Sequence, residues 1–182
     1  RKEEDLARVG DLHRKIGAGL WYKGEREASI DHYQRGIDLL KDGPPCLELV
    51  RLYEEALAVL ELLAASYTLG ALTNGNADVY KTDAGDYFDF AFLAEDIGAS
   101  KPHPDMFQAA LERTGVAAHN VVHVGDDPAH DIAGARAVGM HTVWMNSRGK
   151  NWPEGPRPSR EISNLRQLPQ AIAEIAAAAT GA

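Results

Sequence analysis

Apolar residues in the first third of the chain recur at helical spacing. Intervals of three and four residues separate the members of the series Leu6, Val9, Leu12, Ile16 and Leu20. This spacing places apolar side chains on one face of a helix. A Gly-Pro-Pro run at 43–45 interrupts the pattern, and no alternating strand pattern precedes it. Residues 1–46 are therefore predicted to form a helical subdomain.

Beyond this break, helical and strand-like patterns alternate. The pattern predicts helices over 47–65, in the stretch after 76, over 106–114, over 131–138 and from about 169 onward. Short apolar runs predict strands over 67–72, 88–93, 121–124 and 141–145, and the proline-rich stretch 146–160 is expected to be irregular. Alternating strands and helices favour an α/β fold with a parallel sheet over residues 47–182.

Charge and composition narrow the kinds of partner. The 182-residue chain has a net charge of −8, which would repel nucleic acid or an anionic membrane surface. No apolar run approaches the roughly 20 residues that a membrane-spanning helix needs. The single cysteine, Cys46, cannot form an intramolecular disulfide. We therefore expect a cytoplasmic protein that binds neither nucleic acid nor membrane.

Polar residues follow the strand predicted over 67–72. Thr73, Asn74, Gly75 and Asn76 combine a hydroxyl, side-chain amides and free backbone N–H groups. In an open parallel sheet, ligands bind beyond the carboxyl ends of the strands, so this segment is a candidate anion pocket. The alternative is that Thr73 or Asn74 only caps the helix predicted to follow.

A lysine stands in a second candidate position. Lys101 precedes Pro102, which biases the lysine away from helical geometry and keeps it extended before the next helix. A fixed ammonium group there could neutralise a phosphate as a point charge. The alternative is an ordinary solvated surface lysine.

Three carboxylates follow the strand predicted over 121–124. Asp126, Asp127 and Asp131 repel one another unless a cation or another partner is near. Carboxylate oxygens at a strand end suit Mg²⁺, which takes one or two protein carboxylates and keeps water or phosphate as its other ligands. The alternative is an acidic turn in which Asp131 caps the next helix. His123, inside the strand, is expected to be a core or near-site residue, and Trp144 and Trp152 are expected to be packing residues.

The order of these sites, Thr-Asn, Lys-Pro and Gly-Asp-Asp with a later Asp, resembles motifs two, three and four of the haloacid dehalogenase-like hydrolases. The likeness covers about 47–175. The stretches at 72–77, 85–88, 100–107 and 123–127 look most like the bacterial subgroup that dephosphorylates flavin mononucleotide and ribityl phosphates. The resemblance implies a three-layer, Rossmann-like core over 47–182 and a partial helical cap over 1–46.

The resemblance also implies a role for each site residue. Thr73, Asn74 and Gly75 would hold the transferring phosphoryl group, and Lys101 would balance its charge. Asp126 would ligate Mg²⁺, and Asp127 would be a ligand or a contact through water. Asp131 would contact these residues rather than the ion itself. The implied activity is Mg²⁺-dependent hydrolysis of a small phosphorylated metabolite.

One family motif has no counterpart in the chain. The first motif, Asp-x-Asp-x-Thr, supplies the nucleophile, the general acid/base and two metal contacts, yet no two aspartates in these 182 residues lie two positions apart. We therefore expect the nucleophile to lie upstream of Arg1, where it would form an aspartyl phosphate that water then hydrolyses. The 182-residue chain alone is expected to be inactive.

Three other interpretations are considered, and the same motifs argue against the first two. A dehalogenase of the same superfamily would act without metal and would lack the acidic pair Asp126-Asp127. A receiver-like module would place its acidic pair before the lysine, whereas Lys101 precedes Asp126. A degenerate, non-catalytic member of the superfamily would look the same as an enzyme whose first motif lies outside the chain.

Overall fold

The computed structural model describes residues 47–75 and 78–180. The chain divides into two units, Arg1–Glu54 and Glu55–Ala182. The helical subdomain predicted over 1–46 lies outside the described residues, as does Asn76. The second unit holds all three candidate sites, so the fold is described for that part of the chain.

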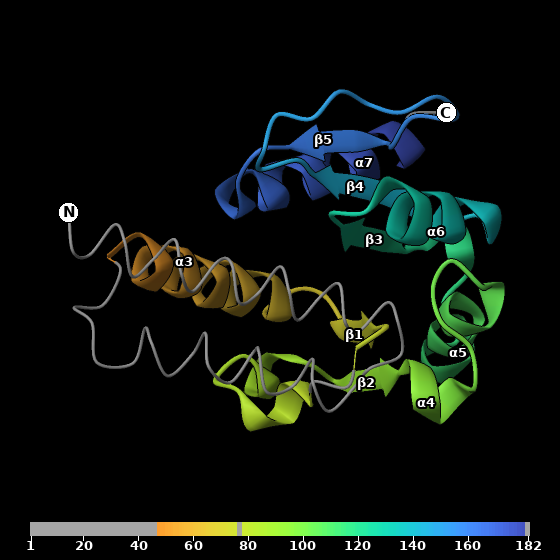
Figure 1. The fold of residues 1–182 in the computed structure, drawn as a ribbon, viewed down its shortest axis with the longest axis horizontal. Helices are drawn as coiled ribbons and strands as arrows, with labels where there is room; N and C mark the ends of the chain where they lie inside the picture. The colour runs from red at the N-terminus through yellow and green to blue at the C-terminus, as the bar shows by residue number, and fades with distance from the viewer. Residues whose placement is uncertain (1–46, 76–77, 181–182) are drawn as a thin grey trace, which may run out of the picture. The chain divides into compact units, whose positions relative to one another are not determined.

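The described elements alternate between helices and strands (Figure 1). In chain order they are α3 (Leu47–Ala64), β1 (Gly70–Thr73), β2 (Phe90–Leu93), α4 (Ala94–Ile97), α5 (Pro104–Thr114), β3 (Val122–Gly125), α6 (Gly134–Ala137), β4 (His141–Met145), β5 (Arg160–Ile162) and α7 (Leu168–Thr180). Short 3₁₀ turns lie at η1 (Val79–Lys81), η2 (Gly85–Tyr87), η3 (Ala118–Asn120) and η5 (Leu165–Gln167), and a π-helical turn lies at η4 (Pro128–Ala133).

All strand pairs in the described part of the chain are parallel. β1 pairs with β2, with Gly70 opposite Phe90, and a second sheet has the order β3-β4-β5, with Val122 opposite His141. The predicted parallel α/β fold is therefore confirmed. β1 and β3 each pair on one side only, and no backbone hydrogen bond joins the two sheets among these residues.

Two apolar clusters pack helices against the strands. In the first, Val59 and Leu63 of α3 meet Ile175 of α7, and Leu69, Val122 and Val124 pack against them. In the second, Met106 and Phe107 of α5 meet Ala135 of α6, and Leu72 and Val121 pack against them. Since alternate strand residues point to opposite faces, the strands lie between two helical layers. This is the predicted three-layer arrangement.

One local prediction was wrong. The helix expected after residue 76 is replaced by the turns η1 and η2; the run from Thr82 to Gly85 is poor in helix formers, and Asp78 caps only a single turn. The helix expected over 131–138 is present but begins earlier, as the π-helical turn η4. The stretch 146–160 is irregular as expected up to residue 159, and strand β5, which is too short to show an alternating pattern, was not predicted.

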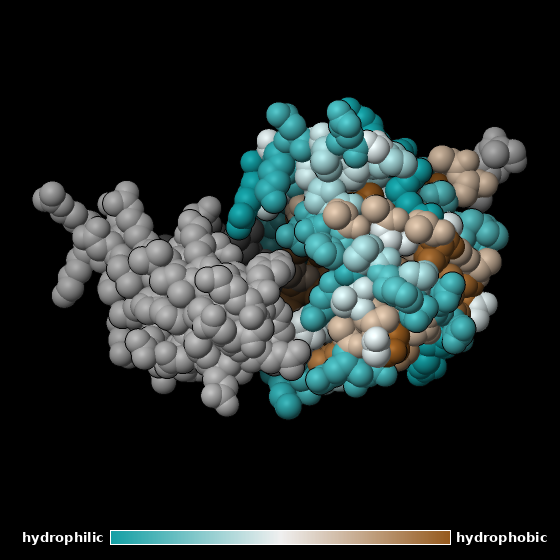
Figure 2. All heavy atoms as spheres, turned by 45° about the vertical axis from the view of Figure 1, so that its right-hand side comes forward, coloured by the Kyte–Doolittle hydropathy of each residue, from teal (hydrophilic) through white to brown (hydrophobic). Residues whose placement is uncertain are grey.

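The surface of the described residues gives no sign of a membrane span. No helix among them is both long enough and apolar enough to cross a bilayer. Figure 2 shows hydrophobic areas interrupted by hydrophilic ones on the face that it presents. The large apolar side chains that are exposed, Leu62, Tyr67, Tyr80 and Val116, come from separate elements.

Candidate active site

Two of the three predicted sites lie at the carboxyl ends of β1 and β3. Thr73 is the last residue of β1, and Gly125, the last of β3, leads directly into Asp126 and Asp127. Lys101 lies in the loop between α4 and α5. Ligands bind at this edge in open parallel sheets because the strand ends leave a crevice there.

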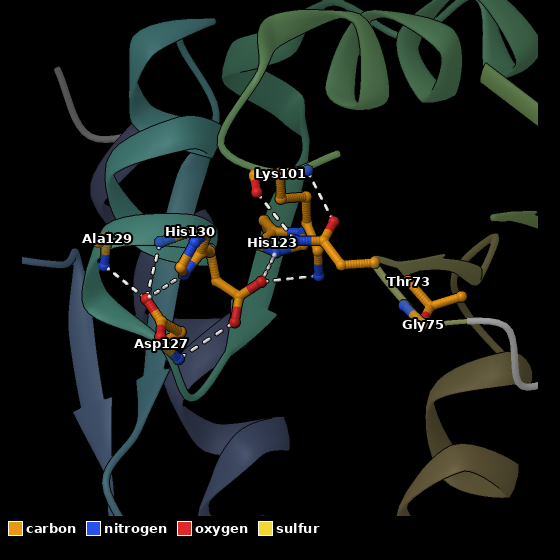
Figure 3. Close-up of polar contacts among 9 residues, drawn as sticks. Thr73, Gly75, Lys101, His123, Asp127, Ala129 and His130 are labelled. Atoms are coloured by element: carbon orange, nitrogen blue, oxygen red, sulfur yellow. Dashed lines mark hydrogen bonds and ion pairs between the residues drawn. The ribbon is translucent and has the colours of Figure 1, made fainter. Parts of the chain in front are cut away.

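Lys101, Asp131 and His123 form a buried cluster, which Figure 3 shows. The Lys101 ammonium lies 2.7 Å from Oδ1 of Asp131, and the two side chains are only 12% and 8% exposed. Nε2 of His123 lies 3.4 Å from the same oxygen, and its ring meets Phe107 edge-on. His123 is therefore a near-site residue, as expected from its place in the strand.

The Asp131 carboxylate is ionised despite its burial. Burial raises the pKa of Asp131, but hydrogen bonds from His123 and Lys101 and the charge of Lys101 outweigh it and hold the pKa well below its ordinary value. The other oxygen accepts a hydrogen bond of 3.1 Å from the backbone N–H of Asp127. Gly125 makes room for this arrangement, because a Cβ there would overlap the Asp131 side chain. Asp131 therefore ties the loop after β3 to Lys101.

Asn74 clamps the backbone of Lys101. Its side-chain amide donates to the Lys101 carbonyl at 2.8 Å and accepts from the Lys101 N–H at 2.6 Å. Both ends of the amide are thus engaged, although the residues are 27 positions apart in sequence. The expected role of Asn74 in holding phosphate remains a prediction, and the observed role is to position Lys101.

Thr73 and Gly75 make a tight polar turn after β1. The Thr73 hydroxyl oxygen accepts the Gly75 N–H at 3.0 Å (Figure 3). No hydrogen bond donated by that hydroxyl is found among the described residues, so its proton is available to an anion. The alternative, in which Thr73 or Asn74 caps a helix, does not hold here, because Asp78 caps the next turn.

Asp127 is the N-terminal cap of the π-helical turn. Its Oδ1 accepts the N–H groups of Ala129 and His130 at 2.8 Å each, and Nδ1 of His130 lies 3.0 Å away (Figure 3). Partial burial raises the pKa of Asp127, but these hydrogen bonds outweigh it and lower the pKa below its ordinary value. One oxygen is committed to the cap, which leaves the other for a ligand.

Asp126 is the exposed member of the acidic group. No hydrogen bond or ion pair to its carboxylate is found in the described part of the chain, and its backbone carbonyl accepts from Nε1 of Trp144 at 3.0 Å. No three His, Cys, Asp or Glu side chains among the described residues gather as a metal site. The predicted repulsion among the three aspartates is thus relieved by Lys101 and by the cap. One free carboxylate fits an ion that uses few protein ligands, such as Mg²⁺.

Sequence reasoning missed two contributors to this site. Trp144 is buried, as a packing residue should be, but its contact with Asp126 depends on strand register, which the sequence does not show. His130 carries one available signal, since it lies three residues after Asp127 at the start of a helical segment.

The comparisons with known proteins agree on the family. A family model described as haloacid dehalogenase-like hydrolase matches residues 7–139, more than half of the chain. The 5-amino-6-(5-phospho-D-ribitylamino)uracil phosphatase YigB of Escherichia coli is 38% identical over 117 residues, which are 62% of this chain and 49% of YigB. The chain spans about half the length of the curated relatives it matches, 49–55% for the first three.

Solved structures share the fold and include two kinds of enzyme. A 2-haloacid dehalogenase from Pseudomonas syringae pv. tomato is 36% identical with a TM-score of 0.66, covering 93% of this chain and 73% of the dehalogenase. A phosphatase from Thermococcus onnurineus is 30% identical with a TM-score of 0.62, covering 91% of this chain and 86% of the phosphatase. The chain therefore belongs to the haloacid dehalogenase-like hydrolase family.

Proposed function

We propose that the chain is part of a Mg²⁺-dependent phosphatase that hydrolyses a small phosphomonoester. Flavin mononucleotide or a ribityl or sugar phosphate is the proposed substrate class. The likeness to YigB, whose name specifies a phosphorylated ribityl compound, supports this choice. So does the motif pattern at 72–77 and 123–127.

The observation that carries this proposal is the way Lys101 is held. Asn74, after β1, binds its backbone, and Asp131, after β3, binds its ammonium group. A lysine fixed from both sides can stabilise negative charge without reorganising during the reaction, which is how charged transition states are stabilised most effectively. The Thr73 hydroxyl is the second proposed donor to phosphate.

A metal ion is the proposed partner of Asp126. Its carboxylate is exposed and free of protein contacts among the described residues, and Asp127 keeps one uncommitted oxygen. Bound Mg²⁺ would neutralise charge on the phosphate oxygens. The two aspartates would hold the ion, while Lys101 would orient and neutralise the phosphate from the opposite side.

The nucleophile is proposed to come from an additional parallel strand between β1 and β3. Both are apolar strands with one unpaired edge, and all residues of both are only partly buried or exposed. β4, with a partner on each side, buries Thr142, Val143 and Trp144 almost completely. A strand in that position, ending in Asp-x-Asp-x-Thr, would bring its first aspartate to the edge that carries Thr73 and Asp126. We call this chain preceded by such a segment the extended protein.

Dehalogenation is the rival function, because a 2-haloacid dehalogenase is 36% identical to this chain. The two functions differ in their need for metal and in the bond that breaks. The acidic pair Asp126-Asp127 favours the phosphatase, since a metal-free dehalogenase has no use for an exposed carboxylate beside its nucleophile.

The test is a panel of substrates given to the extended protein. We expect phosphate release from flavin mononucleotide or another small phosphate ester with Mg²⁺, and none when the ion is chelated. We also expect no halide release from 2-haloacids. Halide release in chelator, without phosphate release under any condition, would replace the phosphatase proposal with a dehalogenase.

A further inference from the structure

We infer that Trp144 is a positioning residue for Asp126, acting through the peptide group that joins Asp126 to Asp127. This inference rests on the metal-binding role of Asp126 proposed above. Trp144 lies on β4, next to β3, the strand that leads into Asp126 and Asp127. Neither its position in the sequence nor its burial indicates a role in the site. The assignment comes from its hydrogen bond.

The Asp126–Asp127 peptide group is held at both ends. Its carbonyl oxygen accepts from Nε1 of Trp144 at 3.0 Å. Its N–H donates to Oδ2 of Asp131 at 3.1 Å. A peptide unit is planar, so fixing its oxygen and its hydrogen fixes the orientation of the whole group. The Cα of Asp126, from which the side chain extends, is thereby constrained, although the carboxylate itself has no partner among the described residues.

Strand register explains why a residue of β4 reaches Asp126. Trp144 pairs in the parallel sheet with Gly125, the residue immediately before Asp126. Asp126 follows the last residue of β3, where the ladder ends and a backbone carbonyl needs another donor. The indole N–H is a donor only, and the ring is long enough to extend past the strand end. Trp144 is 1% exposed, so its position is fixed by packing.

The loop after β4 holds the indole in place. The Trp152 ring packs edge-on against Trp144, with ring centres 5.0 Å apart. Nε1 of Trp152 lies 3.4 Å from the Gly155 carbonyl, within the same loop. At the start of the loop, the buried Asn146 side chain bonds the Lys150 backbone at both its N–H and its carbonyl, each at 2.8 Å. Trp152 therefore supports Trp144 but does not touch Asp126.

The inference predicts a specific loss of metal affinity. Trp144→Phe keeps an aromatic ring in the core but removes the N–H donor. Losing a group that orients a metal ligand weakens metal binding by roughly tenfold or more. Mn²⁺ is the probe, because it favours carboxylate ligands and its free concentration is measured directly by electron paramagnetic resonance. The experiment titrates Mn²⁺ into the extended protein, which adds the metal contacts that the resemblance assigns to the first motif; in the comparisons below, the unaltered chain is the extended protein without substitutions.

Two control variants separate positioning from general damage. Val143→Ala removes two methyl groups from a fully buried neighbour on β4, so it lowers the melting temperature without altering the hydrogen bond to Asp126. Trp152→Phe removes an indole that does not contact Asp126. We expect both to keep the Mn²⁺ dissociation constant within about twofold of the unaltered chain. Asp126→Asn, which replaces the proposed ligand, should abolish binding.

The outcomes distinguish this inference from the proposed function. The positioning role is supported if the Mn²⁺ dissociation constant rises roughly tenfold in Trp144→Phe but not in Val143→Ala or Trp152→Phe. The melting temperature of Trp144→Phe must also be no lower than that of Val143→Ala. Equal affinity in Trp144→Phe and the unaltered chain, while Asp126→Asn binds nothing, overturns the positioning role and leaves the metal site standing. An unaltered chain that binds no Mn²⁺, or an Asp126→Asn variant that binds it normally, overturns both.

Discussion

The two sheets differ in how completely their strands are covered. In the β3-β4-β5 sheet, the central strand buries Thr142, Val143 and Trp144 almost completely. In the β1-β2 sheet, no strand residue is fully buried. The sheets also differ in their edges, because β4 has a strand partner on each side whereas β1 and β2 each pair on one side only.

The difference shows how the candidate site is assembled. The β3-β4-β5 sheet supplies the carboxylates, and the β1-β2 sheet supplies the hydroxyl and amide groups. Among the described polar contacts, the link between them is Lys101, bound by Asn74 on one side and Asp131 on the other. A site whose two sides meet at one residue depends on that link and, in the proposed function, on the additional strand between the unpaired edges.

Removing the positive charge of Lys101 should have the largest effect on catalysis. Lys101→Met keeps the length of the side chain but removes the ammonium group that Asp131 and the phosphate would share. We expect kcat of the extended protein to fall by about a hundredfold or more, as when a preorganised stabilising group is lost. Steady-state phosphate release measures it. The matched control is Lys81→Met, since Lys81 is 82% exposed and pairs only with Asp78 at the surface; a similar loss there would contradict the account.

Breaking the link on the β3 side should chiefly lower stability. Asp131→Asn leaves Lys101 without its buried counter-ion, which costs about 3 kcal/mol in the free energy of unfolding. Chemical denaturation measures the change. Glu174→Gln, in an exposed pair with Arg160, is the control and should change the free energy of unfolding far less.

The ion pair between Lys101 and Asp131 predicts how the stability of the chain changes with pH. The pKa of Asp131 is lower in the folded than in the unfolded chain, so its stabilisation is present above the unfolded pKa of about 3.9 and is lost as pH falls toward the folded value. The unaltered chain should therefore lose stability below about pH 4 more steeply than Asp131→Asn. Parallel acid profiles would show that Asp131 is not the responsible group.

Breaking the link on the β1 side should have a smaller effect. Asn74→Ala removes both hydrogen bonds to the Lys101 backbone but leaves the ion pair with Asp131 intact. We expect kcat to fall by about tenfold, because a misplaced but present charge retains part of its effect. Compared with Asn74→Ala, Asn74→Asp restores only the hydrogen-bond acceptor. Its kcat should therefore lie between those of Asn74→Ala and the unaltered protein. An unchanged kcat in Asn74→Ala would show that the ion pair alone positions Lys101.

The smallest predicted effect is at the end of β1. Thr73→Val removes the hydroxyl while keeping the shape, which should cost the equivalent of one neutral hydrogen bond, about 1 kcal/mol or roughly fivefold in kcat/KM. Thr73→Ser should retain most of the activity. If Thr73→Val and Thr73→Ser behave alike, the hydroxyl does not bind the substrate.

Much of this architecture was predictable because its signals are local. Alternating helical and strand-like patterns predicted the parallel α/β core, polar residues after the runs at 67–72 and 121–124 indicated two candidate sites, and Lys101 before Pro102 indicated the third. The structure adds the pairing between distant groups. That Asn74 would bind the Lys101 backbone, and that Asp131 would neutralise Lys101, depends on loop geometry over tens of residues.

Other features escaped prediction because their causes are tertiary. Strand β5 has three residues and shows no periodicity of its own; pairing with β4 stabilises it. The contact of Trp144 with Asp126 follows from the register of β3 against β4, which no spacing within either segment encodes. Asp127 was predicted as a metal ligand, but its capping role depends on the π-helical turn that begins at Pro128.

The central claim is that this chain holds the proposed phosphate-binding and metal-binding residues of the site but not the Asp-x-Asp pair that would supply its nucleophile and general acid/base. The direct test compares phosphate release by the 182-residue chain, by the extended protein, and by an extended protein in which the first aspartate of Asp-x-Asp is changed to Asn. We predict background rates for the first and third and an increase of at least about a thousandfold in the second, all with Mg²⁺. Equal turnover by the chain alone would contradict the claim, as would an extended protein that remains inactive toward every phosphate ester.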